Sequence, residues 1–190
     1  DALYLSEIPG FTVLCPSSFA ELRSMLRQAL FQAEGPVAVR YPRGGEGVFQ
    51  GDTSSRSLVC QREGGDVTLL GYGILINQLL EAAELLEREG IQAEVLKLNQ
   101  ISPLDGTTLE AAVSPEKPLL VLEDCFGAGC VGQRVAAILA ERGRTPCRLI
   151  LKNLGKTFAP EGSVAELNRR FGLDAAGVAE AVREAVKHGK

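Results

Sequence analysis

The sequence predicts an α/β protein in which helices cover both faces of a mainly parallel sheet. Short apolar runs rich in β-branched residues alternate along the chain with segments of helical periodicity, which is the pattern of β-α-β units. The composition, 45% apolar and 23% charged, is typical of a globular protein. The predicted strands cover residues 12–15, 37–41, 67–71, 93–98, 119–122 and 148–151.

Four helices are predicted between and after these strands, over residues 19–33, 75–89 and 130–141 and after Asp174. The first has a clear start, because Ser18 and Glu21 stand at the spacing of a capping box. The second ends at Gly90, a residue type suited to a left-handed helix cap. The fold class therefore rests on both element types and on their alternation.

A shift in composition divides the chain into two units. Glycine, serine and charged residues dominate 46–65, and we interpret this stretch as a linker between residues 1–45 and 66–190. The first unit contains only a strand, a helix and a strand, which cannot bury both faces of a sheet. We therefore expect it to be the end of a larger domain, whereas residues 66–190 can fold alone.

The charge balance excludes two classes of partner. The formal net charge is −4 and the pI is about 5.2, with no basic stripe, so neither nucleic acid nor an anionic membrane surface is an expected partner. No apolar run approaches the roughly 18 residues that a membrane-spanning helix needs.

The cysteines and the histidine offer little chemistry. Five cysteines form no Cys-x-x-Cys pair, and the single histidine, His188, stands in a polar tail. We therefore predict no metal site, no activated nucleophile and no catalytic residue in this chain, and a reducing compartment, the cytoplasm. The chain begins with Asp1 and its one methionine is Met25, so we expect a fragment or a processed product.

Two arginines are the first candidate site residues. Arg40 and Arg43 follow the predicted strand 37–41 in the segment Arg-Tyr-Pro-Arg-Gly. Ligands of open α/β sheets collect beyond the carboxyl ends of strands, where a guanidinium can bind a phosphate or carboxylate with two hydrogen bonds. The alternative is that these arginines pair with surface acids such as Glu46.

A glycine-rich turn is the second candidate. Residues 127–132 follow the strand 119–122 and precede a helix, so their N–H groups could bind an anion at the helix start. The same glycines also suit close packing of a strand against a helix. Glu123 and Asp124 stand between strand and turn, and because neighbouring strand residues face opposite sides, they cannot both face one site.

Several segments resemble the C-terminal part of the 1-deoxy-D-xylulose-5-phosphate synthase family, and the resemblance covers essentially the whole chain. The most specific are Arg-Tyr-Pro-Arg-Gly at residues 40–44 and Gly-Leu-Asp-Ala-Ala-Gly at residues 172–177. The others are residues 1–5, 8–10, 16–17, 35–39 and 121–123. These segments favour this synthase over transketolase and over the β subunits of 2-oxo acid dehydrogenases.

The resemblance implies a fold and a reaction. Residues 1–45 would be the last β-α-β of a pyrimidine-binding domain, and residues 66–190 a three-layer transketolase C-terminal domain. The family uses thiamine diphosphate and Mg²⁺ to decarboxylate pyruvate and to join the two-carbon unit to glyceraldehyde 3-phosphate. The resemblance implies that Arg43 binds the phosphate of the aldehyde, and that the complete enzyme is a homodimer.

The cofactor residues of the family fall outside this resemblance. Gly51-Asp52-Thr53 and Gly65-Asp66-Val67 do not supply the Gly-Asp-Gly motif that the metal and diphosphate require, and the family's activating glutamate and histidines lie upstream. We therefore expect no cofactor-binding residue here, and a fragment that is inactive without the missing N-terminal domains. The alternatives are a partner subunit of a split transketolase-like enzyme and an unrelated flavodoxin-like binding domain.

Overall fold

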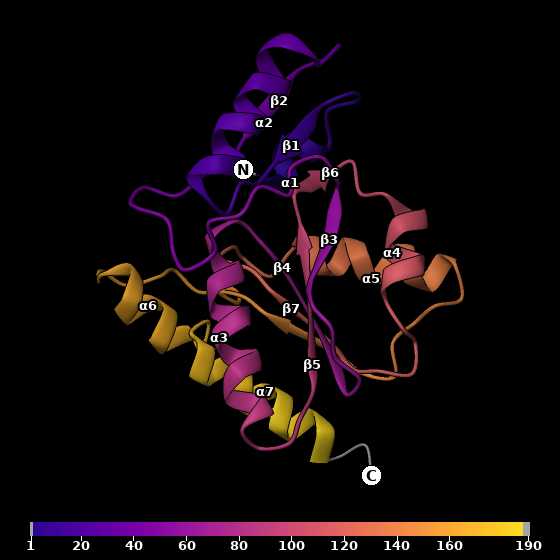
Figure 1. Cartoon of the computed structure of the whole chain (residues 1–190), viewed down its shortest axis with the longest axis vertical. Coiled ribbons are helices and arrows are strands. Elements are labelled where there is room, and N and C mark those ends of the chain that lie inside the picture. Colours follow the sequence, from indigo (N-terminus) through magenta and orange to yellow (C-terminus); the bar gives the residue numbers. More distant parts are fainter. Residues whose placement is uncertain (1, 188–190) are drawn as a thin grey trace.

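The computed structural model describes residues 2–187, which form two β-sheets with helices packed around them (Figure 1). Asp1 and His188, on which two of the expectations above rest, lie outside the described residues. The strands are β1 (Thr12–Leu14), β2 (Val37–Val39), β3 (Leu58–Arg62), β4 (Val67–Tyr72), β5 (Ala93–Leu98), β6 (Gln100–Ser102), β7 (Leu119–Leu122) and β8 (Leu149–Lys152). The helices are α1 (Ala2–Ser6), α2 (Phe19–Phe31), the 3-10 turn η1 (Gly73–Leu75), α3 (Ile76–Glu87), α4 (Gly106–Ala112), α5 (Val131–Glu141), α6 (Val164–Phe171) and α7 (Ala175–Lys187).

The larger sheet has the strand order β3-β5-β4-β7-β8. Strands β5, β4, β7 and β8 are parallel, and β3 is antiparallel to β5 at one edge. The four parallel strands confirm the predicted strands in this unit to within one residue at each end. Because β5 and β7 lie on opposite sides of β4, the carboxyl ends of β4 and β7 meet at the point where the strand order reverses.

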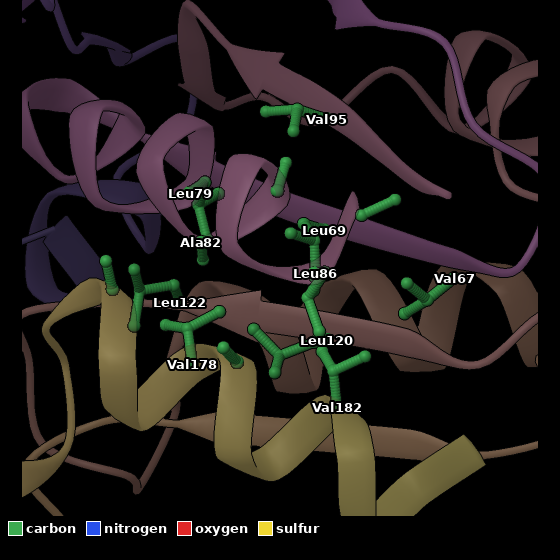
Figure 2. Packing of buried hydrophobic residues seen from close by; sticks show 14 of the residues in the cluster. Val67, Leu69, Leu79, Ala82, Leu86, Val95, Leu120, Leu122, Val178 and Val182 are labelled. Carbon is green, nitrogen blue, oxygen red and sulfur yellow. The ribbon is translucent and has the colours of Figure 1, made fainter. Parts of the chain in front are cut away.

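Side chains that alternate along each central strand build two separate cores. Leu69 and Leu120 point toward α3 and α7, where Figure 2 shows them packed with Leu86 and Val182. Their neighbours Leu70 and Val121 point to the opposite face, in the core to which α5 contributes Val135. Both faces of the parallel sheet are therefore covered, and the predicted three-layer arrangement is confirmed.

The smaller sheet has the order β2-β1-β6. Strands β1 and β2 are parallel and are connected by α2, as predicted for the first unit. The third strand, β6, was not predicted and comes from the far side of the linker, because only Asn99 separates it from β5. The Asn99 carbonyl accepts a hydrogen bond from the Cys15 N–H at 2.8 Å. The two sheets are thus joined by consecutive strands of one chain.

The stretch 46–65, which the sequence analysis assigns to a linker, contains β3. Few side chains of this strand are buried, since only Leu58 is buried and Cys60 is exposed. This explains why the sequence of β3 has only a weak apolar pattern. The division into residues 1–45 and 66–190 stays a prediction. Two strands do not follow this division. Strand β3 lies in the predicted linker but belongs to the larger sheet, and strand β6 lies in the second unit but belongs to the smaller sheet.

The four predicted helices are found with starts within one residue of the prediction, although α2 and α3 each end two residues earlier, and α1, α4 and α6 were not predicted. The Ser18 hydroxyl accepts the Glu21 N–H at 3.1 Å at the start of α2, and Gly90 after α3 has a φ of +82°. At the start of α7, the Asp174 carboxylate accepts the Gly177 N–H at 3.0 Å. Within the described residues, no helix combines the length and the hydropathy that crossing a membrane would require.

Candidate functional site

The first cavity lies at the carboxyl ends of β1 and β2. It measures about 260 Å³, and its walls come from the turn before α2, from the loop after β2 and from Ile74. Arg43 is one of these wall residues, and it forms no ion pair or hydrogen bond with any described residue. This is the position at the sheet edge that the sequence predicted for Arg43, and its guanidinium is available to a ligand.

The same cavity contains the start of α2. The Phe19 N–H at the first helical position donates to Glu46 Oε2 at 2.7 Å, so a carboxylate of the chain already faces this helix end. Glu46, Ser17 and Ser18 all line the cavity with Arg43. The cavity therefore combines an unpaired guanidinium, a helix N-terminus and one acidic side chain.

Arg40 does not share this cavity. Its guanidinium donates to Asp124 Oδ1 at 2.7 Å and lies over the Tyr72 ring, 5.8 Å from the centroid. Burial acts to lower the pKa of Arg40, but Asp124, Tyr72 and Cys15 together outweigh burial, so the pKa is raised. The anticipated pairing with an acid is thus found, although the partner is Asp124 and not Glu46.

The ion pair stands in a second cavity, at the carboxyl ends of β4 and β7. This cavity measures about 420 Å³ and is lined by Tyr72, Cys125, Cys130 and Arg134 as well as by Arg40 and Asp124. The Arg40–Asp124 pair joins the end of β2 in the smaller sheet to the end of β7 in the larger one. The structure therefore separates the two candidate arginines into different cavities and gives them different surroundings.

The helix start behind the glycine-rich turn is occupied by Glu123. Val131 N–H donates to Glu123 Oε2 and Gly132 N–H to Glu123 Oε1, both at 2.8 Å, and the Tyr72 hydroxyl donates to Oε2 at 3.0 Å. Glu123 has no exposed surface. The idea that these N–H groups bind a phosphate is therefore wrong, because an internal carboxylate fills the site. Glu123 and Asp124 face different partners, as the strand alternation predicts.

The thiols beside this cavity are poor nucleophiles. Burial, followed by the neighbouring Glu123 carboxylate, raises the pKa of the Cys125 thiol to about 12. Burial likewise raises the pKa of Cys130. Since the thiolate is the reactive form, neither cysteine is activated at neutral pH.

Sequence reasoning missed a buried charge pair beside the first cavity. Lys97 Nζ on β5 donates to Glu21 Oε1 on α2 at 2.6 Å, and neither side chain is exposed. Thr53 N–H and hydroxyl also donate to Glu21 Oε1, at 3.1 and 2.7 Å. The one available signal was a lysine inside an otherwise apolar strand, which gives no indication of a partner 76 residues away.

The described residues do not fit a magnesium and diphosphate site. One group, Cys60, Glu63 and Glu94, holds ligand atoms within 4.8 Å of one another, but it includes a thiol and lies at the edge strand β3. Mg²⁺ prefers oxygen ligands in octahedral geometry, and the acids beside the two cavities are engaged by Arg40 and by helix N–H groups.

Comparison with known proteins identifies a family model for part of the chain. The model of the transketolase C-terminal domain matches residues 57–178. Its match begins just before β3, so the strand found inside the predicted linker is included in this region.

Curated relatives match almost the whole chain. The 1-deoxy-D-xylulose-5-phosphate synthase of Chlorobium luteolum is 37% identical, with 97% of this chain and 30% of the relative covered. The 1-deoxy-D-xylulose-5-phosphate synthase 1 of Geobacter sulfurreducens is 33% identical, with 95% and 29% covered. The chain therefore spans about 30% of the length of the curated relatives that it matches.

Solved structures match the fold. A split-gene transketolase in the form of an inactive beta4 tetramer superposes with a TM-score of 0.78 at 27% identity, covering 98% of this chain and 61% of that chain. A transketolase of Pichia stipitis superposes with a TM-score of 0.75 at 17% identity, covering 97% of this chain and 26% of that chain. The fold is that of transketolases across both sheets.

Proposed function

We propose that this chain, which belongs to the transketolase C-terminal domain family, is the C-terminal portion of a 1-deoxy-D-xylulose-5-phosphate synthase. The complete enzyme would condense pyruvate with glyceraldehyde 3-phosphate with loss of CO₂, a transferase reaction of non-mevalonate isoprenoid synthesis. Its thiamine diphosphate and Mg²⁺ would be held by domains outside this chain. The chain by itself would be inactive.

The similarity over the whole chain carries this proposal. Identity of 33–37% extends over 95–97% of the chain, including strands β1 and β2 of the smaller sheet, which lie outside the matched family model. The chain spans only about 30% of these relatives, which supports further domains as its partners. Its five free cysteines fit a reducing compartment, the cytoplasm.

The role proposed for this chain is to contribute a phosphate contact and to complete the assembly. Arg43 lines the first cavity without a partner among the described residues, which supports it as the ligand of the aldehyde's phosphate. Arg40 stays a second candidate, but its pairing with Asp124 favours a role in joining the two sheets. A ligand that bound Arg40 would have to compete with a carboxylate at 2.7 Å.

A specific observation favours the second candidate function, a separate partner subunit of a split enzyme. The split-gene transketolase resembles this chain along 98% of its length, and the chain covers 61% of that protein. In both readings the smaller sheet needs a neighbour, because β2 is an edge strand and α2 exposes Leu30 and Phe31, at 73% and 79%. We propose that the missing domains, or the partner subunit, cover this side, in an enzyme that is a homodimer.

One isolation experiment tests the function and separates the two candidates. The polypeptide that contains this sequence is purified from its source cell under native conditions, weighed intact, and assayed with pyruvate, glyceraldehyde 3-phosphate, thiamine diphosphate and Mg²⁺. We expect formation of 1-deoxy-D-xylulose 5-phosphate. A mass far above 20.3 kDa supports a single synthase chain, and a mass near 20.3 kDa with a co-purifying protein supports a split enzyme. An assembly without synthase activity contradicts the proposal.

A further inference from the structure

Besides the N-cap residues Asp105 and Asp174, two carboxylates reach helix starts from other parts of the chain, and these two differ in how firmly they are held. Glu123 at the start of α5 is fully buried and accepts two backbone N–H bonds and the Tyr72 hydroxyl. Glu46 at the start of α2 is only half-buried and accepts a single backbone bond, from Phe19. Both occupy positions that attract anions, because N–H groups and the helix dipole point there. Of these two carboxylates, only Glu46 can move away from its helix start at a small cost in free energy.

The cavity around Glu46 contains a buried polar group that lacks a partner. Ser17 lies in its wall and is 2% exposed, and its hydroxyl oxygen forms no hydrogen bond with any described residue. Buried hydroxyls without partners are uncommon in folded proteins, because losing water without a replacement bond costs free energy. An anion in this cavity would supply the acceptor that Ser17 lacks.

Arg43 supplies the attraction that would bring such an anion in. It lines the cavity together with Ser17 and Glu46, and it has no partner among residues 2–187. A phosphate has three acceptor oxygens and a larger charge than a carboxylate, so it can bind a guanidinium and a helix N–H at once. The cavity thus holds an attractive cation and, at the same helix end, an internal anion that competes.

We propose that Glu46 is a displaceable internal anion, which holds the N-terminus of α2 in the empty cavity and yields it to the phosphate group bound by Arg43. The inference rests on the proposed function of Arg43. It makes Glu46 a residue that determines affinity, because its negative charge opposes every anion that enters. Anions of low charge are excluded most strongly, since they gain least from Arg43 and still meet Glu46.

The test is a titration of the 190-residue chain with inorganic phosphate at constant ionic strength, followed through the backbone amide signals of Phe19 and Ala20 by NMR. Glu46→Gln keeps the size of the side chain and its acceptor oxygen but removes the charge. We expect it to tighten phosphate binding about threefold to tenfold, the size of a nearby partly screened charge. Glu81→Gln is the matched control, because Glu81 is exposed on α3 away from the cavity walls.

A second variant tests the hydroxyl. Ser17→Ala removes a buried group that has no partner, so the chain should be at least as stable as the wild type in urea. Its affinity for phosphate should fall about twofold to fivefold. Unchanged affinity would remove Ser17 from the site, and a large loss of stability would show that the hydroxyl supports the fold instead.

The outcomes separate this inference from the function on which it rests. If Arg43→Ala abolishes phosphate binding while Glu46→Gln binds no more tightly than the wild type, the proposal that phosphate displaces Glu46 is wrong and the role of Arg43 stands. If Arg43→Ala leaves binding unchanged, the phosphate contact itself is wrong. If the Phe19 and Ala20 signals of the Glu46→Gln chain show no saturable shift with phosphate, the inference is contradicted directly.

Discussion

Glu21 and Lys97 are the residues on which the junction of the two sheets depends most. Each is fully buried, and each has several partners, since Lys97 also donates to Asn99 and lies 5.2 Å from the centroid of the Phe49 ring. Burial lowers the pKa of Lys97, and the Glu21 carboxylate opposes that effect. A buried pair is costly to form but more costly to break, because the remaining charge has no water around it.

Lys97→Met should therefore lower the free energy of unfolding by about 3–5 kcal/mol in urea denaturation, since it leaves the Glu21 carboxylate buried and unpaired. The double variant with Glu21→Gln should recover part of this loss. Lys117→Met is the control: Lys117 is partly exposed, lies 3.9 Å from Glu94 and donates to the Gly64 carbonyl at 2.8 Å, and its loss should cost about 1 kcal/mol. Equal effects of the two lysine variants would show that Lys97 carries no special role.

Cys15 gives the stability a dependence on alkaline pH. Burial raises its pKa from 9.0 to about 12 in the folded chain, so in that range the unfolded chain loses the proton first. The contribution of Cys15 is therefore present below pH 9 and is lost as the pH rises toward 12. Between pH 8 and 10, ionisation of the Cys15 thiol in the unfolded chain should lower the free energy of unfolding by about 1 kcal/mol. Cys15→Ala should flatten that slope, and an unchanged slope would contradict the assignment.

At this scale the sequence predicts positions better than partners. Arg43 was placed at a strand end because it follows an apolar run, and the structure has it there. The pairing of Arg40 with Asp124 joins residues 84 apart in sequence, and no local pattern reveals such a contact. Strand alternation correctly predicts that Glu123 and Asp124 face different sides, but it does not show that Glu123 accepts hydrogen bonds from the N–H groups at the start of α5.

Among the elements, α5 is anchored by a carboxylate from outside the helix. Cys130 at its N-cap position makes no side-chain capping bond, and Glu123 at the end of β7 satisfies two of the first N–H groups instead. The strand and the helix are thereby fixed to each other across the glycine-rich turn. Glycine at position 132 favours this close approach, because a Cβ there would lie 2.6 Å from a Leu151 methyl carbon, which would have to move, and 3.0 Å from Glu123 Oε1.

Glu123→Gln should destabilise the chain by about 2 kcal/mol, because the neutral amide loses the attraction of the helix start and brings an N–H₂ group toward N–H donors. Glu141→Gln, at the opposite end of the same helix, is the matched control and should be neutral or slightly stabilising. Thermal unfolding of both variants measures the difference. A Glu123→Gln chain as stable as the wild type would contradict the anchoring role.

Strands with a continuous apolar run were predictable, including the edge strands β2 and β8, whereas β3 and β6 were not. Strands β4 and β7 are apolar on both faces and were predicted almost to the residue. Strand β3 lies at the sheet edge, and β6 has only three residues, so neither has a strong pattern. Helix α6 carried a readable signal, a capping box between Ser163 and Glu166 and a left-handed Gly172, although none of its residues is buried.

The whole molecule is two sheets joined by a short connection and by side-chain bridges. The direct step from β5 to β6 and the Arg40–Asp124 pair connect the two sheets, and the Lys97–Glu21 pair connects β5 to α2, the helix between β1 and β2. The first cavity belongs mainly to the smaller sheet, whose edge strand β2 pairs with β1 on one side and with no described strand on the other. The phosphate contact proposed for Arg43 is therefore next to the side where the remaining domains are expected.

The most direct test of this account is the kinetics of Arg43→Ala in the enzyme assembled from this chain with its N-terminal portion or partner subunit. We predict that the Michaelis constant for glyceraldehyde 3-phosphate rises about tenfold to a hundredfold, the loss of one charged hydrogen-bonding group, and that the value for pyruvate changes less than about twofold. Arg88→Ala, at the exposed C-terminal end of α3 and away from the first cavity, serves as the control and should leave both values unchanged. Equal changes for the two substrates in Arg43→Ala would contradict the account.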